Sequence, residues 1–285
     1  MVPEGWQLTE LGSLASFASG NTPSKSNSAF WNGAYPWVSA KDLKTDRLES
    51  SLATLTEEGY RVAKKAPQGS TLLLVRGMML LKNLPVAYAT RELAFNQDLK
   101  ALVPHAHVDG LFLSYLLQNE KHKLGQLVST AGHGTGRLDT DSIKQFPVCL
   151  PPLPEQQKIA RILSVWDEAI HVCSKLLHNS RQQREGLRQQ LLSGKMRFPQ
   201  DVAPWQIHTL GQAVVLTMGA SPQSSAYNHT QTGLPLVQGR ADIKNGVTSP
   251  RFYTTQTTKT CQIGDVLLSV RAPVGAVALS LHHAA

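Results

Sequence analysis

Two histidines and two aspartates are spaced closely enough to act on one substrate or metal ion. His105 and His107 are separated by one residue, and Asp139 and Asp141 repeat that spacing. Imidazoles and carboxylates bind metals and transfer protons, so this set would suit a nuclease. No set of carboxylate or cysteine ligands accompanies the histidines, and aspartates in a polar loop commonly cap the next helix. The sequence therefore favours a surface loop and a helix cap, with a nuclease kept as an alternative.

Other motifs of catalysis are incomplete. The run 132–137, Gly-His-Gly-Thr-Gly-Arg, resembles a nucleotide loop, but it lacks the glycine spacing and the terminal Lys-Ser/Thr of a phosphate-binding loop. No Gly-x-Ser-x-Gly elbow or cysteine–histidine signature is present. Cys149, Cys173 and Cys261 lie far apart and form no metal or redox pair, which predicts buried thiols in a reducing cytoplasm. These patterns lower the odds of catalysis.

The charge distribution points to a polyanionic partner. The formal net charge is +8, and residues 151–200 alone carry 8 basic against 4 acidic residues. Most of this excess comes from five side chains: Arg181, Arg184, Arg188, Lys195 and Arg197. A basic excess of this kind attracts nucleic acid. A solvated helix face is the alternative interpretation.

Nothing in the sequence predicts a membrane protein. The apolar runs 72–75 and 266–270 end at Arg76 and Arg271, far short of the ~20 apolar residues that a span needs. The first six residues show no basic flank and apolar core, so we expect no signal peptide.

The chain repeats itself. Five matches recur in the same order between the two ends of the chain: 6–12 with 205–211, 20–23 with 219–222, 36–38 with 235–237, 42–43 with 242–243, and 69–76 with 264–271. Matches in a conserved order indicate two copies of one domain. No segment of the chain matches residues 89–198, so the second copy is expected to be incomplete, as in a truncated product. A domain halted midway should leave strands unpaired.

Each copy mixes strands and helices. Short apolar runs bounded by turn residues predict strands, the best of which are 72–75, 86–89, 266–270 and 276–281. Residues 109–127 predict a helix with Leu113, Leu116, Leu117 and Leu124 on one face. We expect the α+β class, with largely antiparallel sheets.

A long helix is predicted between the copies. After Pro151-Pro152-Leu153-Pro154, apolar residues step by four and three alternately and form a seam: Ile159, Leu163, Trp166, Ile170, Cys173, Leu177, Leu187 and Leu191. Ser180 and Arg184 interrupt its second half, and Gly194 fits a helix end. About 40 residues would span about 60 Å, too long for a core helix and typical of a coiled coil. The expected domains are therefore 1–150, the spacer helix 151–198, and an incomplete 199–285.

These segments together resemble the specificity subunit of type I restriction–modification systems. Residues 264–271, continuing through Pro273, Val274 and Gly275, are similar to a recurrent stretch of that family, and residues 75–80, 85–87 and 94–102 are another version. The run from Gly134 to Gln157, through Phe146-Pro147-Val148 and Pro151–Pro154, resembles the junction of a target recognition domain with the conserved helix. The resemblance covers nearly the whole chain.

The resemblance implies a non-catalytic, DNA-binding role. Each recognition domain would read half of a bipartite site in double-stranded DNA, with the helix setting the gap. Modification subunits would methylate adenine with S-adenosylmethionine, and restriction subunits would cut DNA with ATP and Mg, so the chain itself would need no cofactor. It also implies a second helix packed on the seam, so the seam of this chain is expected to serve self-association or to mark an unstable fragment.

Basic and amide side chains on loops are the candidates for contact with phosphates and base edges. In the first copy they are Lys41, Lys44, Arg76, Lys82, Arg91, His133, Thr135 and Arg137. In the second copy they are Arg240, Lys244 and Arg271. Arg76 and Arg271 occupy matching positions after an apolar strand, where an internal ion pair is the alternative. Besides the nuclease, a helical module that binds protein or RNA through 181–197 is a rival function.

Overall fold

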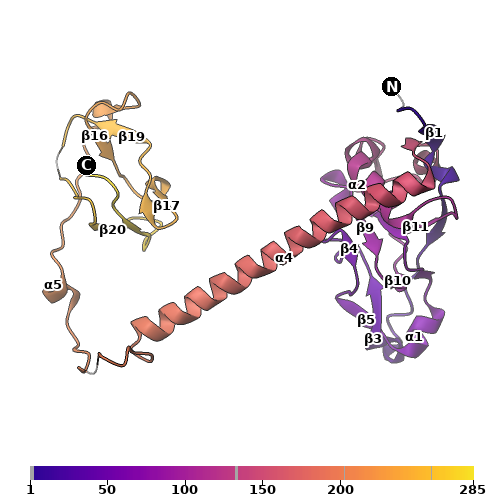
Figure 1. Cartoon of the computed structure of the whole chain (residues 1–285), viewed down its shortest axis with the longest axis horizontal. Helices are drawn as coiled ribbons and strands as arrows, with labels where there is room; N and C mark the ends of the chain where they lie inside the picture. The colour runs from indigo at the N-terminus through magenta and orange to yellow at the C-terminus, as the bar shows by residue number, and fades with distance from the viewer. Residues whose placement is uncertain (1–2, 132–133, 202, 258) are drawn as a thin grey trace. The chain divides into compact units, whose positions relative to one another are not determined.

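The computed structural model describes residues 3–131, 134–201, 203–257 and 259–285. The chain divides into two compact units, Met1–Gln189 and Gln190–Ala285. Figure 1 labels their elements; the positions of the units relative to one another are not determined.

The first unit is built on four sheets, most of whose strand pairs are antiparallel. Its strands are β1 (Gln7–Glu10), β2 (Ala15–Ser19), β3 (Trp31–Val38), β4 (Arg47–Leu48), β5 (Ala53–Leu55), β6 (Lys65–Ala66), β7 (Thr71–Leu74), β8 (Arg76–Gly77), β9 (Val86–Ala89), β10 (Leu93–Phe95), β11 (Leu99–Pro104), β12 (Ser129–Ala131), β13 (Thr135–Arg137) and β14 (Pro147–Leu150). The sheet orders are β2-β11-β7-β9-β4, β5-β3-β10-β6, β12-β13-β8 and β1-β14. Only β3–β10 and β4–β9 are parallel among these pairs of described strands.

The core of this unit surrounds the central strand β7. Leu72, Leu73 and Leu74 are fully buried, because β11 pairs with one edge of β7 and β9 with the other. Helix α2 (Gly110–Gly125) packs on β7 and β9, and buries Leu113, Leu117 and Leu124 as its spacing predicts. The side chain of Asp109 caps it by accepting from the backbone N–H of Phe112.

Shorter helices connect the strands. They are η1 (Leu11–Ser13), η2 (Ser28–Phe30), α1 (Glu57–Val62), η3 (Met78–Leu81) and α3 (Thr140–Lys144). The sequence predicted a loop for 132–137, but Thr135–Arg137 is strand β13, paired with β12 and β8. Its partner β8 lies about sixty residues earlier in the chain, so the local polar composition did not reveal the pairing.

The predicted spacer helix is confirmed. Helix α4 runs without interruption over the 40 residues Leu153–Leu192 (Figure 1). Gly194 follows with a φ of 72°, a left-handed conformation that favours glycine and ends helices. Most seam side chains are exposed; Ile159 and Leu191 are half-buried.

The second unit contains shorter elements. They are α5 (Leu210–Ala213), η5 (Ser224–Ala226), β15 (Tyr227–Asn228), β16 (Leu234–Leu236), η6 (Arg240–Asp242), β17 (Ile243–Lys244), β18 (Val247–Thr248), β19 (Phe252–Thr254), β20 (Val266–Leu268) and β21 (Val277–Leu279). Its sheets have the orders β15-β19-β16 and β17-β18-β21-β20. The strands expected at 266–270 and 276–281 are present but shorter. Among its described apolar residues, only Pro222, Leu236, Ala278 and Ala284 are buried.

The repeated segments form the same three-strand pattern in both units. In the first unit β9 pairs antiparallel with β7 and parallel with β4. In the second unit β21 pairs antiparallel with β20 and parallel with β18. In the first unit β11 pairs with the other edge of β7, whereas no described strand pairs with the matching edge of β20. An unpaired edge exposes backbone N–H and C=O groups, and the side chains of Val266 and Leu268 on β20 are exposed as well.

None of the helices formed by the described residues combines the length and the apolar character needed to cross a membrane. The expectation of buried thiols is wrong: Cys149 and Cys261 are half-buried and Cys173 is exposed on α4. The position of Cys173 on the exposed seam explains the error, because its spacing marks an apolar face and not burial.

Candidate nucleic-acid interface

Two predicted DNA-binding arginines face each other across a strand pair. Strands β8 and β13 are antiparallel, and their register places Arg76 directly opposite Arg137. Both side chains are exposed, and neither forms an ion pair with any described residue. Like charges directly opposite on a sheet are destabilising. An anion bound between them would remove this repulsion.

Further candidates lie on the same loop cluster. Thr135 begins β13, and Lys82 follows η3, which connects β8 to the core. The backbone N–H of Lys82 donates to the carbonyl of Met79, so its position is fixed by the 3-10 turn. His133, also predicted here, lies outside the described residues.

Backbone hydrogen bonds bring the loop of Lys41 and Lys44 to this edge of the unit. Asn96 N–H donates to the carbonyl of Val38, Val75 N–H to that of Asp98, and Leu138 N–H to that of Val75. The segments that carry Lys41, Arg76 and Arg137 therefore begin side by side. Both lysines are exposed.

The aspartate that shapes this loop was not recognised as functional from the sequence. Asp42 Oδ2 accepts from the backbone N–H and the hydroxyl of Ser39, and its Oδ1 accepts from the N–H of Leu52. In the second unit Asp242 occupies the matching position and accepts from Gln238 N–H and from Arg251 Nε. The repeat match 42–43 with 242–243 was the signal for this pair.

Arg91 is not brought to the same edge. It lies in the turn before β10, whereas Asn96 follows β10, so the two are at opposite ends of that strand. Its charge acts on Tyr60, whose ring also lies under Lys65 Nζ, 4.9 Å from the centroid. Burial and a hydrogen bond to Glu92 raise the pKa of Tyr60 above its ordinary value, and Arg91 opposes this rise.

The second-unit candidates are all exposed. Arg240 lies in η6, Lys244 ends β17, and Arg271 follows β20 after two residues. The alternative of an internal ion pair at Arg271 finds no partner within the described ranges. Arg240 and the segment Pro273–Val277 line one shallow hollow.

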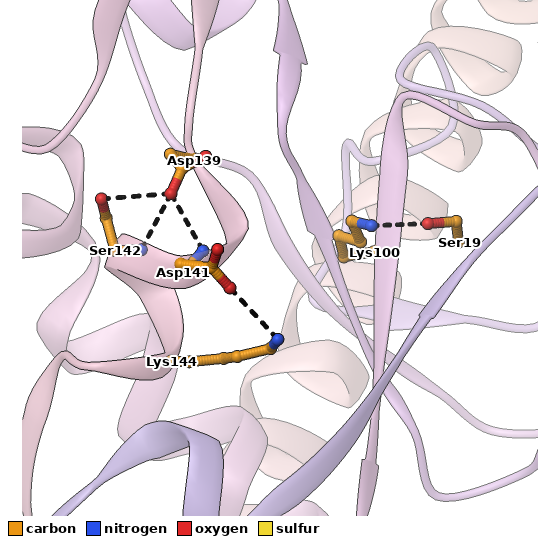
Figure 2. A network of polar contacts seen from close by, with 6 residues as sticks. All are labelled: Ser19, Lys100, Asp139, Asp141, Ser142 and Lys144. Atoms are coloured by element: carbon orange, nitrogen blue, oxygen red, sulfur yellow. Dashed lines mark hydrogen bonds and ion pairs between the residues drawn. The ribbon is translucent and has the colours of Figure 1, made fainter.

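The residues that suggested a nuclease have structural roles instead. Figure 2 shows Asp139 accepting from the backbone N–H groups of Asp141 and Ser142 at 3.0 and 3.1 Å, which caps α3 as predicted. These bonds, that of Ser142 above all, lower the pKa of Asp139. Asp141 forms an ion pair with Lys144. His105 contacts Ser16 and the carbonyl of Ser13. The described residues contain no metal-binding group of three or more such side chains.

Helix α4 is tied to the first unit by polar contacts that sequence reasoning missed. Buried Gln156 donates to the carbonyls of His107 and Pro151 and accepts from the N–H of Asp109. Three turns further, the hydroxyl of Tyr115 donates to Asp167. The start of the spacer is therefore anchored to the same unit that carries the arginine pair.

The comparisons with known proteins agree on one family. The model of the type I restriction modification DNA specificity domain matches residues 3–177. A putative type I restriction enzyme MjaX specificity subunit from Methanocaldococcus jannaschii is 25% identical over 302 residues, covering 97% of this chain and 69% of the relative. The type I restriction enzyme EcoR124I/EcoR124II specificity subunit from Escherichia coli is 31% identical over 160 residues, covering 55% of this chain and 40% of the relative. The chain thus spans about two thirds of the first relative and less than half of the second.

Solved structures share the fold. The crystal structure of a type I restriction-modification system S subunit from M. genitalium aligns with a TM-score of 0.58 at 17% identity, covering 98% of this chain and 69% of that one. A structure concerned with complex assembly and conformational transition of the type I R-M system aligns with a TM-score of 0.55 at 24% identity, covering 100% and 74%. The α+β class with a long spacer helix is confirmed.

Proposed function

The chain belongs to the type I restriction–modification DNA specificity family, and we propose that it reads double-stranded DNA through the short paired strands β8 and β13, which carry Arg76 and Arg137. The resemblance found in the sequence is thereby confirmed. The relatives are named specificity subunits, in agreement with the prediction of a subunit that specifies a site and is not itself an enzyme.

The observation that carries the proposal is the unneutralised arginine pair. Two guanidinium groups opposite each other in β8 and β13 hold a local positive charge, and neither forms an ion pair with a described carboxylate. Asp139 is the described carboxylate that feels the charge of Arg137. Arginine binds the phosphates of DNA with bidentate hydrogen bonds. The lysines at 41, 44 and 82 extend the same charge, and Arg240, Lys244 and Arg271 would serve the second unit in the same way.

The roles of the individual domains and of the partner subunits are proposed from the resemblance to the family. In this proposal 1–150 and 199–285 read the two halves of a bipartite site, and the helix 151–198 sets their separation. Partner modification subunits methylate adenine with S-adenosylmethionine, and restriction subunits cleave DNA with ATP and Mg, so the chain needs no cofactor of its own. The complex would work in the cytoplasm, where these partners meet DNA.

Salt-dependent binding tests DNA recognition directly. Fluorescence anisotropy with the purified chain and labelled duplex DNA should show affinity that falls linearly on a logarithmic salt scale. Arg76→Gln and Arg137→Gln should each reduce the slope by about 1. Arg61→Gln is the matched control, because Arg61 is exposed but paired with Glu57. A chain that fails to bind duplex at low salt, or equal slopes in all variants, would contradict the proposal.

Methylation mapping tests the bipartite assignment. In a host that carries the matching modification subunit, expression of the chain should produce methylated adenines within a motif of two separated halves. Arg76→Gln should lower methylation at all sites without changing the motif, because a phosphate contact carries no sequence information. A contiguous motif, or cleavage of DNA by the purified chain alone, would refute this part.

The exposed seam of α4 favours a second role in self-association. Trp166, Ile170 and Leu177 are each more than half exposed on one face of the helix. An apolar face of this length is typical of a helix that packs on a partner, and a second copy offers the same face. Sedimentation should show a dimer that Ile170→Glu converts to monomer. Lys175→Glu, on the opposite face, should leave the dimer intact; a monomeric parent chain would refute this role.

A further inference from the structure

An apolar tip projects beside the arginine pair. Three of the four residues of η3 are exposed: Met78 by 74%, Met79 by 41% and Leu81 by 49%. In the sequence they are flanked by two basic residues: Arg76, on strand β8 before them, and Lys82, directly after them. Because these apolar side chains are exposed to water, they contribute no burial energy to the fold of the isolated chain. Their position indicates a surface with an apolar centre and a charged surround.

The tip is held rigidly. Leu80, the remaining residue of η3, is buried in the core, and both Lys82 N–H and Asn83 N–H donate to the carbonyl of Met79. Strand β13 packs directly beneath it: a Cβ at Gly136 would lie 2.9 Å from Leu80 Cβ and 3.1 Å from the carbonyl oxygen of Gly77. A preorganised projection loses little entropy when it enters a partner.

The second unit repeats the arrangement at the matching loop. Arg271 stands at the repeat position of Arg76, and Val274, at the repeat position of Met79, is 72% exposed. The hydroxyl of Ser269 lies 3.0 Å from the carbonyl oxygen of Arg271 and 3.1 Å from that of Pro273, so its single hydrogen is shared between them and holds the turn. Arg240 lines the same hollow as Val274. Two loops of different length therefore both place an apolar residue next to arginine.

The chemistry of this surface fits duplex DNA. A duplex has phosphates on the outside and an apolar base stack within, and proteins that bend DNA insert Met, Leu or Pro between base steps while basic residues bind the backbone. The charge complementarity comes from Arg76, Arg137 and Lys82, none of which has an ionic partner among the described side chains. A protein partner would need an apolar pocket surrounded by carboxylates to complement this surface.

We propose that the η3 tip is a wedge that enters the DNA between base steps and distorts the duplex, with Met78 as the leading side chain and the arginine pair on the flanking phosphates. The inference rests on the proposed function, DNA binding by these loops, and adds a mode of recognition to it. A base step unstacked by the wedge would be easier for a partner enzyme to open.

Binding to a preweakened duplex tests the wedge. Two labelled duplexes of the same random sequence are compared by anisotropy with the full chain, one intact and one with a central single-base bulge. Because the bulge removes part of the cost of unstacking, the parent chain should bind the bulged duplex about tenfold more tightly. Met78→Ser should reduce this preference to about onefold while leaving the salt slope unchanged. Leu8→Ser is the control and should retain the preference, because Leu8 is a similarly exposed apolar residue on β1, distant in sequence from the η3 tip.

The outcomes separate the wedge from DNA binding itself. If the parent chain binds neither duplex, the proposed function fails and the wedge falls with it. If it binds both duplexes equally, with a normal salt slope, DNA binding stands and the wedge is overturned. If Met78→Ser keeps the preference but abolishes copurification with a modification subunit, the tip is a protein interface, which also overturns the wedge. Thermal unfolding of the variant should match that of the parent, since Met78 is exposed.

Discussion

The hydroxyl of Tyr115 donates a 2.5 Å hydrogen bond to Oδ2 of Asp167, and so joins α2 to the spacer helix α4. Arg47 Nη2 lies 4.0 Å from the same carboxylate oxygen and 3.5 Å from the Tyr115 hydroxyl. Three elements, β4, α2 and α4, therefore meet at one carboxylate. The contact fixes the helix against the first unit beyond its first turns.

Tyr115→Phe should loosen this attachment. A hydrogen bond to a charged group contributes about 1.5–3 kcal/mol to stability. Because Asp167 is partly exposed, we expect the free energy of unfolding to fall by about 1 kcal/mol. Hydrogen exchange should increase around residues 160–167, and the melting temperature should fall by a few degrees. Tyr88→Phe is the control, because the Tyr88 hydroxyl makes no hydrogen bond within the described ranges. Unchanged exchange along α4 would contradict the role.

Gln156→Leu should destabilise the first unit more strongly. Its amide satisfies three backbone groups, and the leucine would leave the buried carbonyl of Pro151 and the partly buried N–H of Asp109 without this partner. An unsatisfied buried group costs about 1–3 kcal/mol, which urea denaturation can resolve. The neighbouring Gln157 is exposed, so Gln157→Leu should change stability by less than about 0.5 kcal/mol. Equal effects of the two substitutions would show that the network contributes little.

Arg137→Gln should stabilise the free chain while weakening its binding to DNA. The substitution removes the repulsion from Arg76 across the strand pair, a gain of about 0.2–1 kcal/mol. Thermal unfolding at low salt should show the gain, and added salt should diminish it by screening. Lys144→Gln is a useful comparison, because Lys144 is paired with Asp141 and its loss should give no gain. A lower melting temperature for Arg137→Gln would refute the repulsion.

Stability should decline at alkaline pH because of Tyr60. Burial first, and the hydrogen bond to Glu92 next, raise the pKa of its phenol above the ordinary 10.0. The folded state therefore holds this proton more tightly than the unfolded state, so the stabilisation is complete below pH 10 and is lost as the pH rises above it. Urea denaturation at pH 8 and pH 11 should show the loss, and Tyr60→Phe should make it smaller. Tyr253→Phe, in the second unit, should leave it unchanged.

The elements that depend on local periodicity were predictable. The seam spacing located α4 to within a few residues, and the leucine spacing and Asp109 located α2, because both signals lie within one segment of the chain. The apolar runs that predict β7 and β20 are local signals of the same kind.

The geometry of the site was not predictable, because it depends on pairing between distant segments. Arg76 and Arg137 were chosen separately, and only the register of β8 with β13 places them opposite each other. Gln156 carries no local signal of its role, since two of the backbone groups that it satisfies, the carbonyl of His107 and the N–H of Asp109, lie almost fifty residues earlier in the chain. Arg91 shares the charge of the other candidates, but the direction of β10 separates it from them.

The anchorage of α4 turns the helix into a lever. From Asp167 to Leu192 the helix extends about 38 Å at 1.5 Å per residue. A tilt of α4 by about 5° at Asp167 would displace Leu192 by about 3 Å, close to the ~3.4 Å rise of one base pair. Small changes in the contacts of Tyr115 and Arg47 with Asp167 would therefore be amplified into a displacement of several ångströms at the far end of α4.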